Sequence, residues 1–115
     1  MNFNELLYKR RSTRQFDPSV AIDRDELTAL LDAACCAPSG NNAQPWRFVV
    51  ITDAALREKL LPLAYNQQQI LTASAVVLLL ADHTAYQRDN LARIHQEEFA
   101  EGCFNAEVRD FLTEA

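Results

Sequence analysis

The chain has 115 residues, of which 49% are hydrophobic and 23% charged, a composition typical of one folded globular domain rather than a disordered chain. Its net charge of −5 argues against nucleic acid or an anionic membrane surface as a partner. The longest apolar run, Ala75 to Ala81, is too short to cross a bilayer, and the amino terminus lacks a signal-peptide pattern, so we expect a cytoplasmic protein.

The first predicted element is a short helix that begins after Asn2. Asn2 and Glu5 have the spacing of a capping box, and the helix should end near Arg10 or Arg11. A turn at Asp17 then separates it from the next helix.

A basic segment, defined here as residues 10–14, follows this first helix. Arg10 and Arg14 share a face whether the segment is helical or extended, and in the extended case Ser12 joins them. Because a planar guanidinium can bind two phosphate oxygens at once, this spacing is compatible with a phosphate site. A solvated basic helix end explains the same residues equally well, so the spacing leaves both interpretations open.

The rest of the chain alternates helices and strands. Asp23 and Glu26 form a second capping box, which opens a helix with one apolar stripe that Pro38 stops. The elements predicted after it are a buried strand over 46–52, a helix from Asp53 to about 63, a short helical turn from Asn66, a buried strand over 75–81, a helix over 85–101 with Gly102 as its C-cap, and a helical stripe over 104–112.

The loop between the second helix and the first strand is the most informative stretch. It has consecutive amide residues between Pro38 and Pro45, more than a simple turn needs. Asn42 and Gln44 can each donate and accept hydrogen bonds, as the polar edge of a flavin ring does. This pattern favours a ligand loop over the alternative, a mere helix stop and turn.

Several other residue types narrow the possible chemistry. With only two glycines, the chain cannot form the glycine-rich phosphate loops of P-loop or Rossmann proteins. We expect the cysteines at 35, 36 and 103 to be core or interface residues and His83 and His95 to be surface residues. No metal-ligand spacing and no nucleophile with an adjacent base is present, which suits a protein whose chemistry belongs to a bound cofactor.

Two motifs together resemble a known family. Arg-Arg-Ser-x-Arg after a first helix, and Ala-Pro-Ser-Gly-x-Asn-x-Gln-Pro-Trp-Arg-Phe running into a strand, are similar in order and spacing to the amino-terminal half of the FMN-dependent nitroreductases, through about Ala81. The resemblance implies an α+β fold with a mixed sheet flanked by helices. It also implies a homodimer with two FMN sites between the subunits, and one nitroreductase-like domain over residues 1–115, partial relative to the family.

The resemblance also assigns roles to site residues. By it, one subunit contacts the FMN phosphate and ribityl chain through Arg10, Arg11, Ser12 and Arg14, and the other approaches the flavin with Pro38, Ser39, Gly40 and Asn42. Asn66 matches a position that reads the ring edge. Gln69 sits where many relatives carry a basic residue near the flavin, and its spacing from Asn66 predicts that both point to one side of a helical turn.

The implied activity is transfer of hydride from NAD(P)H through FMN to an electron-poor acceptor such as a nitroaromatic or a quinone. The chain is shorter than its relatives, and its sheet looks unfinished. The sequence leaves open a fragment, a shortened relative, or another way of completing the sheet. The alternative functions are a non-catalytic module that dimerises or is only marginally folded, and a flavin enzyme of the same fold with another reaction.

Overall fold

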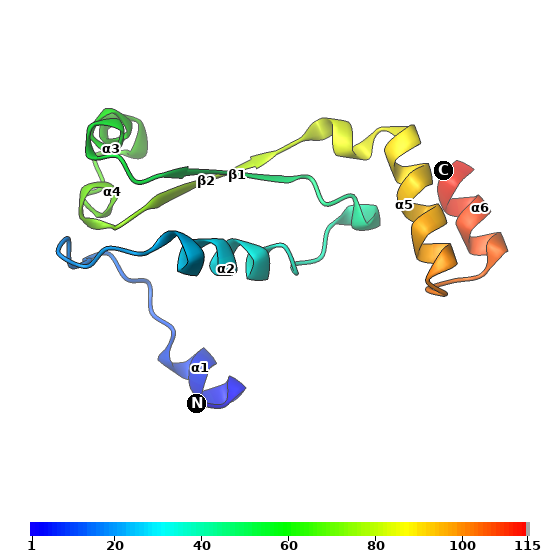
Figure 1. Cartoon of the computed structure of the whole chain (residues 1–115), viewed down its shortest axis with the longest axis horizontal. Coiled ribbons are helices and arrows are strands. Elements are labelled where there is room, and N and C mark those ends of the chain that lie inside the picture. The colour runs from blue at the N-terminus through cyan, green and yellow to red at the C-terminus, as the bar shows by residue number, and fades with distance from the viewer. Residues whose placement is uncertain (115) are drawn as a thin grey trace. The chain divides into compact units, whose positions relative to one another are not determined.

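The computed structural model describes residues 1–114 and divides the chain into two compact units. One unit contains Met1–Asp23 and Val50–Val77, and the other contains Arg24–Val49 and the chain from Leu78 onward. Helices and strands both occur, in an order close to the predicted one (Figure 1), which confirms an α+β fold. The prediction of a single domain stays a prediction.

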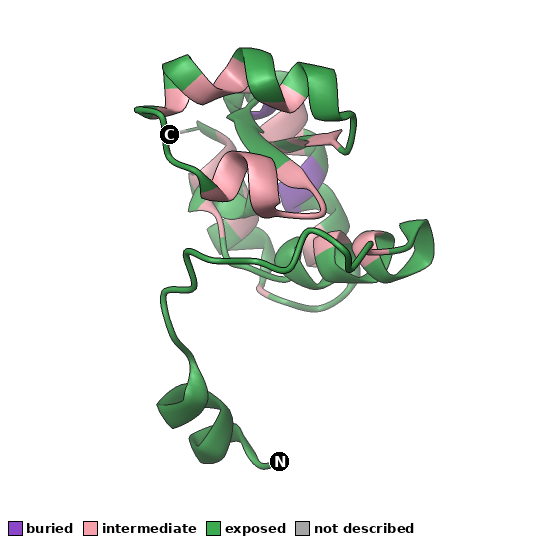
Figure 2. Cartoon of the chain, turned by 90° about the vertical axis from the view of Figure 1, so that its left-hand side faces the viewer, coloured by how far each residue is buried: buried purple, intermediate pink, exposed green. Residues whose placement is uncertain are grey.

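The first unit begins with α1 (Phe3–Lys9). The predicted capping box is confirmed: Asn2 Oδ1 accepts from the Glu5 N–H at 3.0 Å, and Glu5 Oε2 accepts from the Asn2 N–H at 3.2 Å. Every residue of α1 is exposed (Figure 2), and residues 10–16 have no regular structure. The turn at Asp17 is also confirmed, with the Ser19 N–H and hydroxyl donating to the Asp17 carboxylate at 2.9 and 2.6 Å.

The same unit contains α3 (Ala54–Leu60), a 3-10 turn over Leu61–Ala64 and α4 (Gln69–Thr72), which pack together. Asp53 caps α3 as predicted, because its Oδ1 accepts from the Leu56 N–H at 2.8 Å. Arg57 on α3 donates to the carbonyl oxygens of Leu71, at 3.1 Å, and of Ala73. Arg57 therefore binds α3 to the end of α4.

The second unit contains α2 (Arg24–Ala34), a 3-10 turn over Gly40–Asn42, a 3-10 turn over His83–Tyr86, α5 (Arg88–Ala100) and α6 (Ala106–Glu114). The helix predicted over 85–101 is interrupted at Gln87, whose backbone is extended. The physical reason is the carboxylate of Asp82, which accepts from the Thr84 N–H and hydroxyl and so starts a separate turn.

A helical hairpin is formed by α5 and α6, which lie side by side (Figure 1). The predicted C-cap is confirmed: Gly102 has φ +78°, its N–H donates to the Phe99 carbonyl at 3.0 Å, and the Cys103 N–H donates to the Glu98 carbonyl at 2.9 Å. The Arg109 guanidinium lies 4.6 Å from the centre of the Phe99 ring. Phe104 precedes α6 rather than lying on it.

The two strands, β1 (Trp46–Ile51) and β2 (Val76–Ala81), form a small antiparallel sheet and end within one residue of the predicted bounds. The Asp82 N–H donates to the Pro45 carbonyl at 2.8 Å at the edge of this ladder. The prediction that the strands are buried is wrong, since Leu79 is 64% exposed and Val49 is 42% exposed. Two strands within this chain have too few layers around them to cover both faces.

Buried residues all lie in the second unit among the residues described: Ala43, Pro45, Ala85, Ile94 and His95 (Figure 2). The prediction for His95 is wrong, because its side chain is only 1% exposed, whereas His83 is exposed as predicted. The tertiary packing around α5 covers a position that the sequence pattern places on a helix surface. The cysteines at 35, 36 and 103 are exposed, so a core role is wrong for them and an interface role stays a prediction.

No helix within residues 1–114 combines the length and the apolar character needed to cross a membrane.

Candidate functional site

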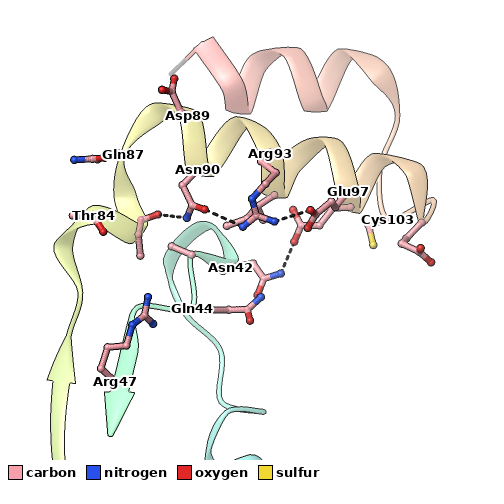
Figure 3. Close-up of a pocket in the computed structure, with 15 residues that line it drawn as sticks. Asn42, Gln44, Arg47, Thr84, Gln87, Asp89, Asn90, Arg93, Glu97 and Cys103 are labelled. Atoms are coloured by element: carbon pink, nitrogen blue, oxygen red, sulfur yellow. Dashed lines mark hydrogen bonds and ion pairs between the residues drawn. The ribbon is translucent and has the colours of Figure 1, made fainter.

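A cavity of about 740 Å³ opens in the second unit between the amide loop, defined here as residues 38–45, and α5 (Figure 3). The side chains that matter for its chemistry are polar: Asn42, Gln44 and Arg47 from the loop and β1, and Asn90, Arg93 and Glu98 from α5. The loop predicted to hold a ligand therefore does form one wall of a cavity.

The amide loop has an unusual backbone. Asn41, Asn42 and Gln44 have φ values of 50°, 49° and 50°, in the left-handed region. Asparagine tolerates this region better than other non-glycine residues, whereas glutamine is strained there. Strain of this kind persists only where other contacts hold the backbone, and it is typical of functional loops.

Two groups of side-chain bonds hold this conformation. Within the loop, the Gln44 N–H donates to Ser39 Oγ at 3.0 Å, and Gln44 Nε2 donates to Asn42 Oδ1 at 3.2 Å. Beyond the loop, Asn42 Nδ2 donates to Glu98 Oε1 on α5 at 2.9 Å (Figure 3). The amide of Asn42 is thus bonded on both sides.

The facing side of α5 is itself cross-linked. Arg93 donates to Glu97 Oε1 at 2.6 Å and to Asn90 Oδ1 at 2.9 Å, and Asn90 Nδ2 donates to the Ala85 carbonyl at 2.7 Å (Figure 3). Asn90, Arg93 and Glu98 were not predicted from the sequence as site residues. Asn90, Arg93 and Glu97 are spaced three and four residues apart, which is the signal that could have grouped this face of α5, whereas Glu98 lies outside that spacing.

Arg47 is also paired, since its guanidinium donates to Asp82 Oδ2 at 2.8 Å. The pKa of Asp82 lies below its usual value, chiefly because the Thr84 hydroxyl and N–H donate to it, with Arg47 adding a smaller attraction. Both arginines of this cavity are therefore neutralised by carboxylates. The cavity is unsuited to a phosphate, which would have to be held elsewhere.

The arginines of the basic segment differ from the two paired arginines of the cavity. The guanidinium groups of Arg10 and Arg14 are exposed and have no hydrogen bond or ion pair within residues 1–114, and Ser12 is exposed beside them. Arg11 instead donates to the carbonyls of Tyr8 and Arg10 at 2.7 and 2.9 Å. Because α1 ends at Lys9, the helical alternative for this segment is wrong.

Asn66 and Gln69 belong to the first unit, like the basic segment. Asn66 lies in the left-handed region with φ +55°, and α4 begins only at Gln69. The prediction that both share one helical turn is therefore wrong: Tyr65 and Asn66 reverse the chain after the proline-containing turn. The structure groups Pro38, Ser39, Gly40 and Asn42 in the amide loop, and it keeps the basic segment in the other unit.

Comparison with known proteins assigns the family. The nitroreductase family model matches residues 7–109. The chain is 44% identical over 110 residues to YdgI of Bacillus subtilis, named as an NAD(P)H nitroreductase, and this match covers 95% of the chain and 52% of that protein. It is 37% identical over 98 residues to a CLA biosynthesis enone reductase of Lactiplantibacillus plantarum, covering 81% of the chain and 45% of the reductase.

Comparison with solved structures supports the same family. A nitroreductase-like protein from Streptococcus mutans matches with a TM-score of 0.79 and 35% identity, over 98% of this chain and 55% of that one. A nitroreductase from Exiguobacterium sibiricum, crystallised in complex with FMN, matches with a TM-score of 0.75 and 37% identity, over 99% of this chain and 54% of that one. The chain belongs to the nitroreductase family, and it spans about half the length of the relatives it matches.

The residues present fit a flavin mononucleotide at two separate places. Arg10 and Arg14 provide guanidinium donors that no group within residues 1–114 satisfies, which is the chemistry a phosphate monoester needs. The amide loop provides a strained, internally bonded backbone with amide groups, which suits the polar edge of a flat ring.

Proposed function

We propose that this chain is an FMN-dependent oxidoreductase that takes hydride from NAD(P)H. The observation that carries the proposal is the pair of exposed guanidinium groups of Arg10 and Arg14, unpartnered within residues 1–114, in a family with a member crystallised with FMN. Arginines without internal partners favour a phosphate ligand because their donors are free and the site needs no rearrangement of other ion pairs.

Each group of site residues has a distinct part in the proposal. Arg10, Arg14 and Ser12 hold the phosphate, and Arg11 shapes the end of α1 through its carbonyl bonds. The segment Pro38–Asn42 approaches the ring, and Asn66 and Gln69 contribute polar groups near it. FMN, when bound, supplies acceptance and donation of hydride, and the chain's residues bind and orient it.

The complete site needs a second subunit in this proposal. Phe3, Leu6 and Leu7 of α1 are 72%, 54% and 54% exposed, a large amount of apolar surface for a seven-residue helix. Burial of this surface against another copy would stabilise a homodimer, since removing apolar area from water is the main force in association. The basic segment of one copy would then meet the amide loop of the other.

We also propose that the protein is cytoplasmic. The electron acceptor in this proposal is a small electron-poor molecule such as a nitroaromatic or a quinone. The enone reductase among the relatives extends the candidates to a carbon–carbon double bond conjugated to a carbonyl. Phe104, Val108 and Phe111, near or on α6, are the side chains we expect to influence this choice, because Val108 and Phe111 are 41% and 71% exposed and available for contact.

Titration of the purified chain with FMN tests the proposal. We expect quenching of flavin fluorescence, a yellow protein after gel filtration, and consumption of NAD(P)H in the presence of a quinone. A colourless protein that takes up no FMN at any concentration below about 1 mM would contradict it, since that limit corresponds to a binding free energy of only about −4 kcal/mol.

A second candidate is a non-catalytic module that dimerises or is only marginally folded. It is favoured by the small number of buried residues within 1–114 and by the match to about half the length of the relatives compared above. Steady turnover of NAD(P)H by the chain with added FMN would exclude this candidate. Light scattering that gives the mass of a dimer, without flavin uptake or turnover, would favour it.

A further inference from the structure

The hydrogen bond between Asn42 and Glu98 joins two segments that are 56 residues apart in the sequence. Of the two neighbouring carboxylates on α5, Glu97 is occupied by Arg93 at 2.6 Å, whereas Glu98 is directed to the loop. Figure 3 shows Asn42 reaching from the loop toward this part of α5. The contact is therefore specific to Glu98, which is half-buried.

The chemistry of this bond fixes which way the Asn42 amide faces. An ionised carboxylate can only accept hydrogen bonds, so Glu98 selects the nitrogen of Asn42 as its partner. The oxygen of Asn42 must then face the other way, where it accepts from Gln44 Nε2 at 3.2 Å. Gln44 is in turn held through its N–H by Ser39 Oγ at 3.0 Å.

This series of bonds runs through the strained part of the loop. Asn42 and Gln44 both have positive φ, and the three bonds involving Glu98, Asn42, Gln44 and Ser39 oppose relaxation of that backbone. We propose that Glu98 is a positioning residue, which holds the amide loop in its binding conformation and orients the Asn42 amide for the ligand. For the flavin as that ligand, the inference rests on the proposed function above.

Exchanging the donor and the acceptor of the hydrogen bond between Asn42 and Glu98 tests the proposal. Asn42→Asp places two carboxylates opposite each other and should open the loop, because like charges at hydrogen-bond distance repel. Adding Glu98→Gln restores a donor opposite the new carboxylate, and in that double variant the carboxylate introduced at position 42 can still accept from Gln44 Nε2. The matched control is Asn4→Asp with Glu58→Gln, the same two chemical changes at exposed positions of α1 and α3, outside the amide loop and α5.

The first measurement needs no flavin: the solvent-exchange rate of the backbone N–H groups of residues 39–44, followed by NMR in the full 115-residue chain. We expect exchange at Gln44 about tenfold faster in Asn42→Asp, and a return to within about twofold of wild type in the double variant, since one net hydrogen bond to a charged group corresponds to roughly a tenfold effect. The control changes should leave the rate unaltered. A double variant as fast as Asn42→Asp overturns the proposal.

The second measurement is FMN affinity and the absorption spectrum of bound flavin in the same variants. If wild type binds FMN, we expect affinity to fall about tenfold in Asn42→Asp and to recover in the double variant, for the same loss and return of one charged hydrogen bond. Unchanged affinity and spectrum in Asn42→Asp would overturn the role in flavin binding. If wild type binds no FMN, the proposed function fails, and the exchange rates still decide whether Glu98 positions the loop.

Discussion

The basic segment and the amide loop are the two parts of the candidate site, and they differ in how they are held. The guanidinium groups of Arg10 and Arg14 are exposed and bond to no other group within residues 1–114. Asn42 and Gln44 are bonded within the loop and to α5. This difference indicates that the loop is organised by bonds within its own chain, whereas in our proposal a ligand provides the contacts of the two guanidinium groups.

The largest effect should come from the basic segment. Changing both Arg10 and Arg14 to alanine should weaken FMN binding by several kcal/mol, because each hydrogen bond to a charged group contributes about 1.5–3 kcal/mol. Fluorescence titration with FMN measures this loss. Arg88→Ala with Lys59→Ala, two exposed basic residues outside the segment, is the control and should bind as wild type does. Equal affinities in the two double variants would show that the phosphate is held elsewhere.

Arg57 sharpens the comparison, since it is an arginine of the same unit whose guanidinium does donate hydrogen bonds to its own chain. Arg57→Ala should lower the free energy of unfolding by about 2 kcal/mol, because the carbonyls of Leu71 and Ala73 lose their charged donor. Urea denaturation measures the change, with Lys59→Ala on the exposed face of α3 as the control. FMN affinity should not change in either variant unless the fold is lost.

His95 tests whether the second unit is stabilised by its internal contacts. Both ring nitrogens of His95 are buried without a hydrogen-bond partner within residues 1–114, an arrangement that costs free energy. We expect His95→Leu to raise the free energy of unfolding by about 1 kcal/mol, and His95→Ala to lower it by about 2 kcal/mol through the cavity it leaves. His83→Leu, at an exposed position, is the control. A strongly destabilising His95→Leu would mean that the imidazole bonds to a further segment or subunit.

The smallest effect should be a pH dependence shared by both units. The pKa of Asp17 is lowered by the Ser19 hydroxyl and N–H, and the pKa of Asp82 chiefly by the Thr84 hydroxyl and N–H. Because a lowered pKa means that the folded state favours the ionised carboxylate, this stabilisation is present above the unfolded pKa of about 4 and is lost as the pH falls through the lower folded value.

Asp82→Asn and Asp17→Asn should therefore have a lower free energy of unfolding than wild type at pH 7. In strong acid this difference from wild type should become small. Urea denaturation at a series of pH values measures both. A difference that is constant over the acid range would show that neither carboxylate is held by its turn.

Much of the local structure could be predicted from residue types and spacing. The caps at Asn2 and Asp53, the turn at Asp17 and the glycine at 102 act within four or five residues, so their effects are visible in the sequence. The order of the amide loop and β1 was predictable for the same reason, and with the basic segment it was enough to indicate the family.

The sequence did not reveal contacts between distant segments. His95 is buried on α5, against which α6 packs, and burial of this kind depends on tertiary packing rather than on the local pattern. The bond of Glu98 to Asn42 links positions 56 residues apart, which no local pattern specifies. Short-range propensities thus determined the elements and the two motifs, whereas only tertiary structure decided which side chains are covered, strained or paired, because those properties depend on what the chain brings next to them.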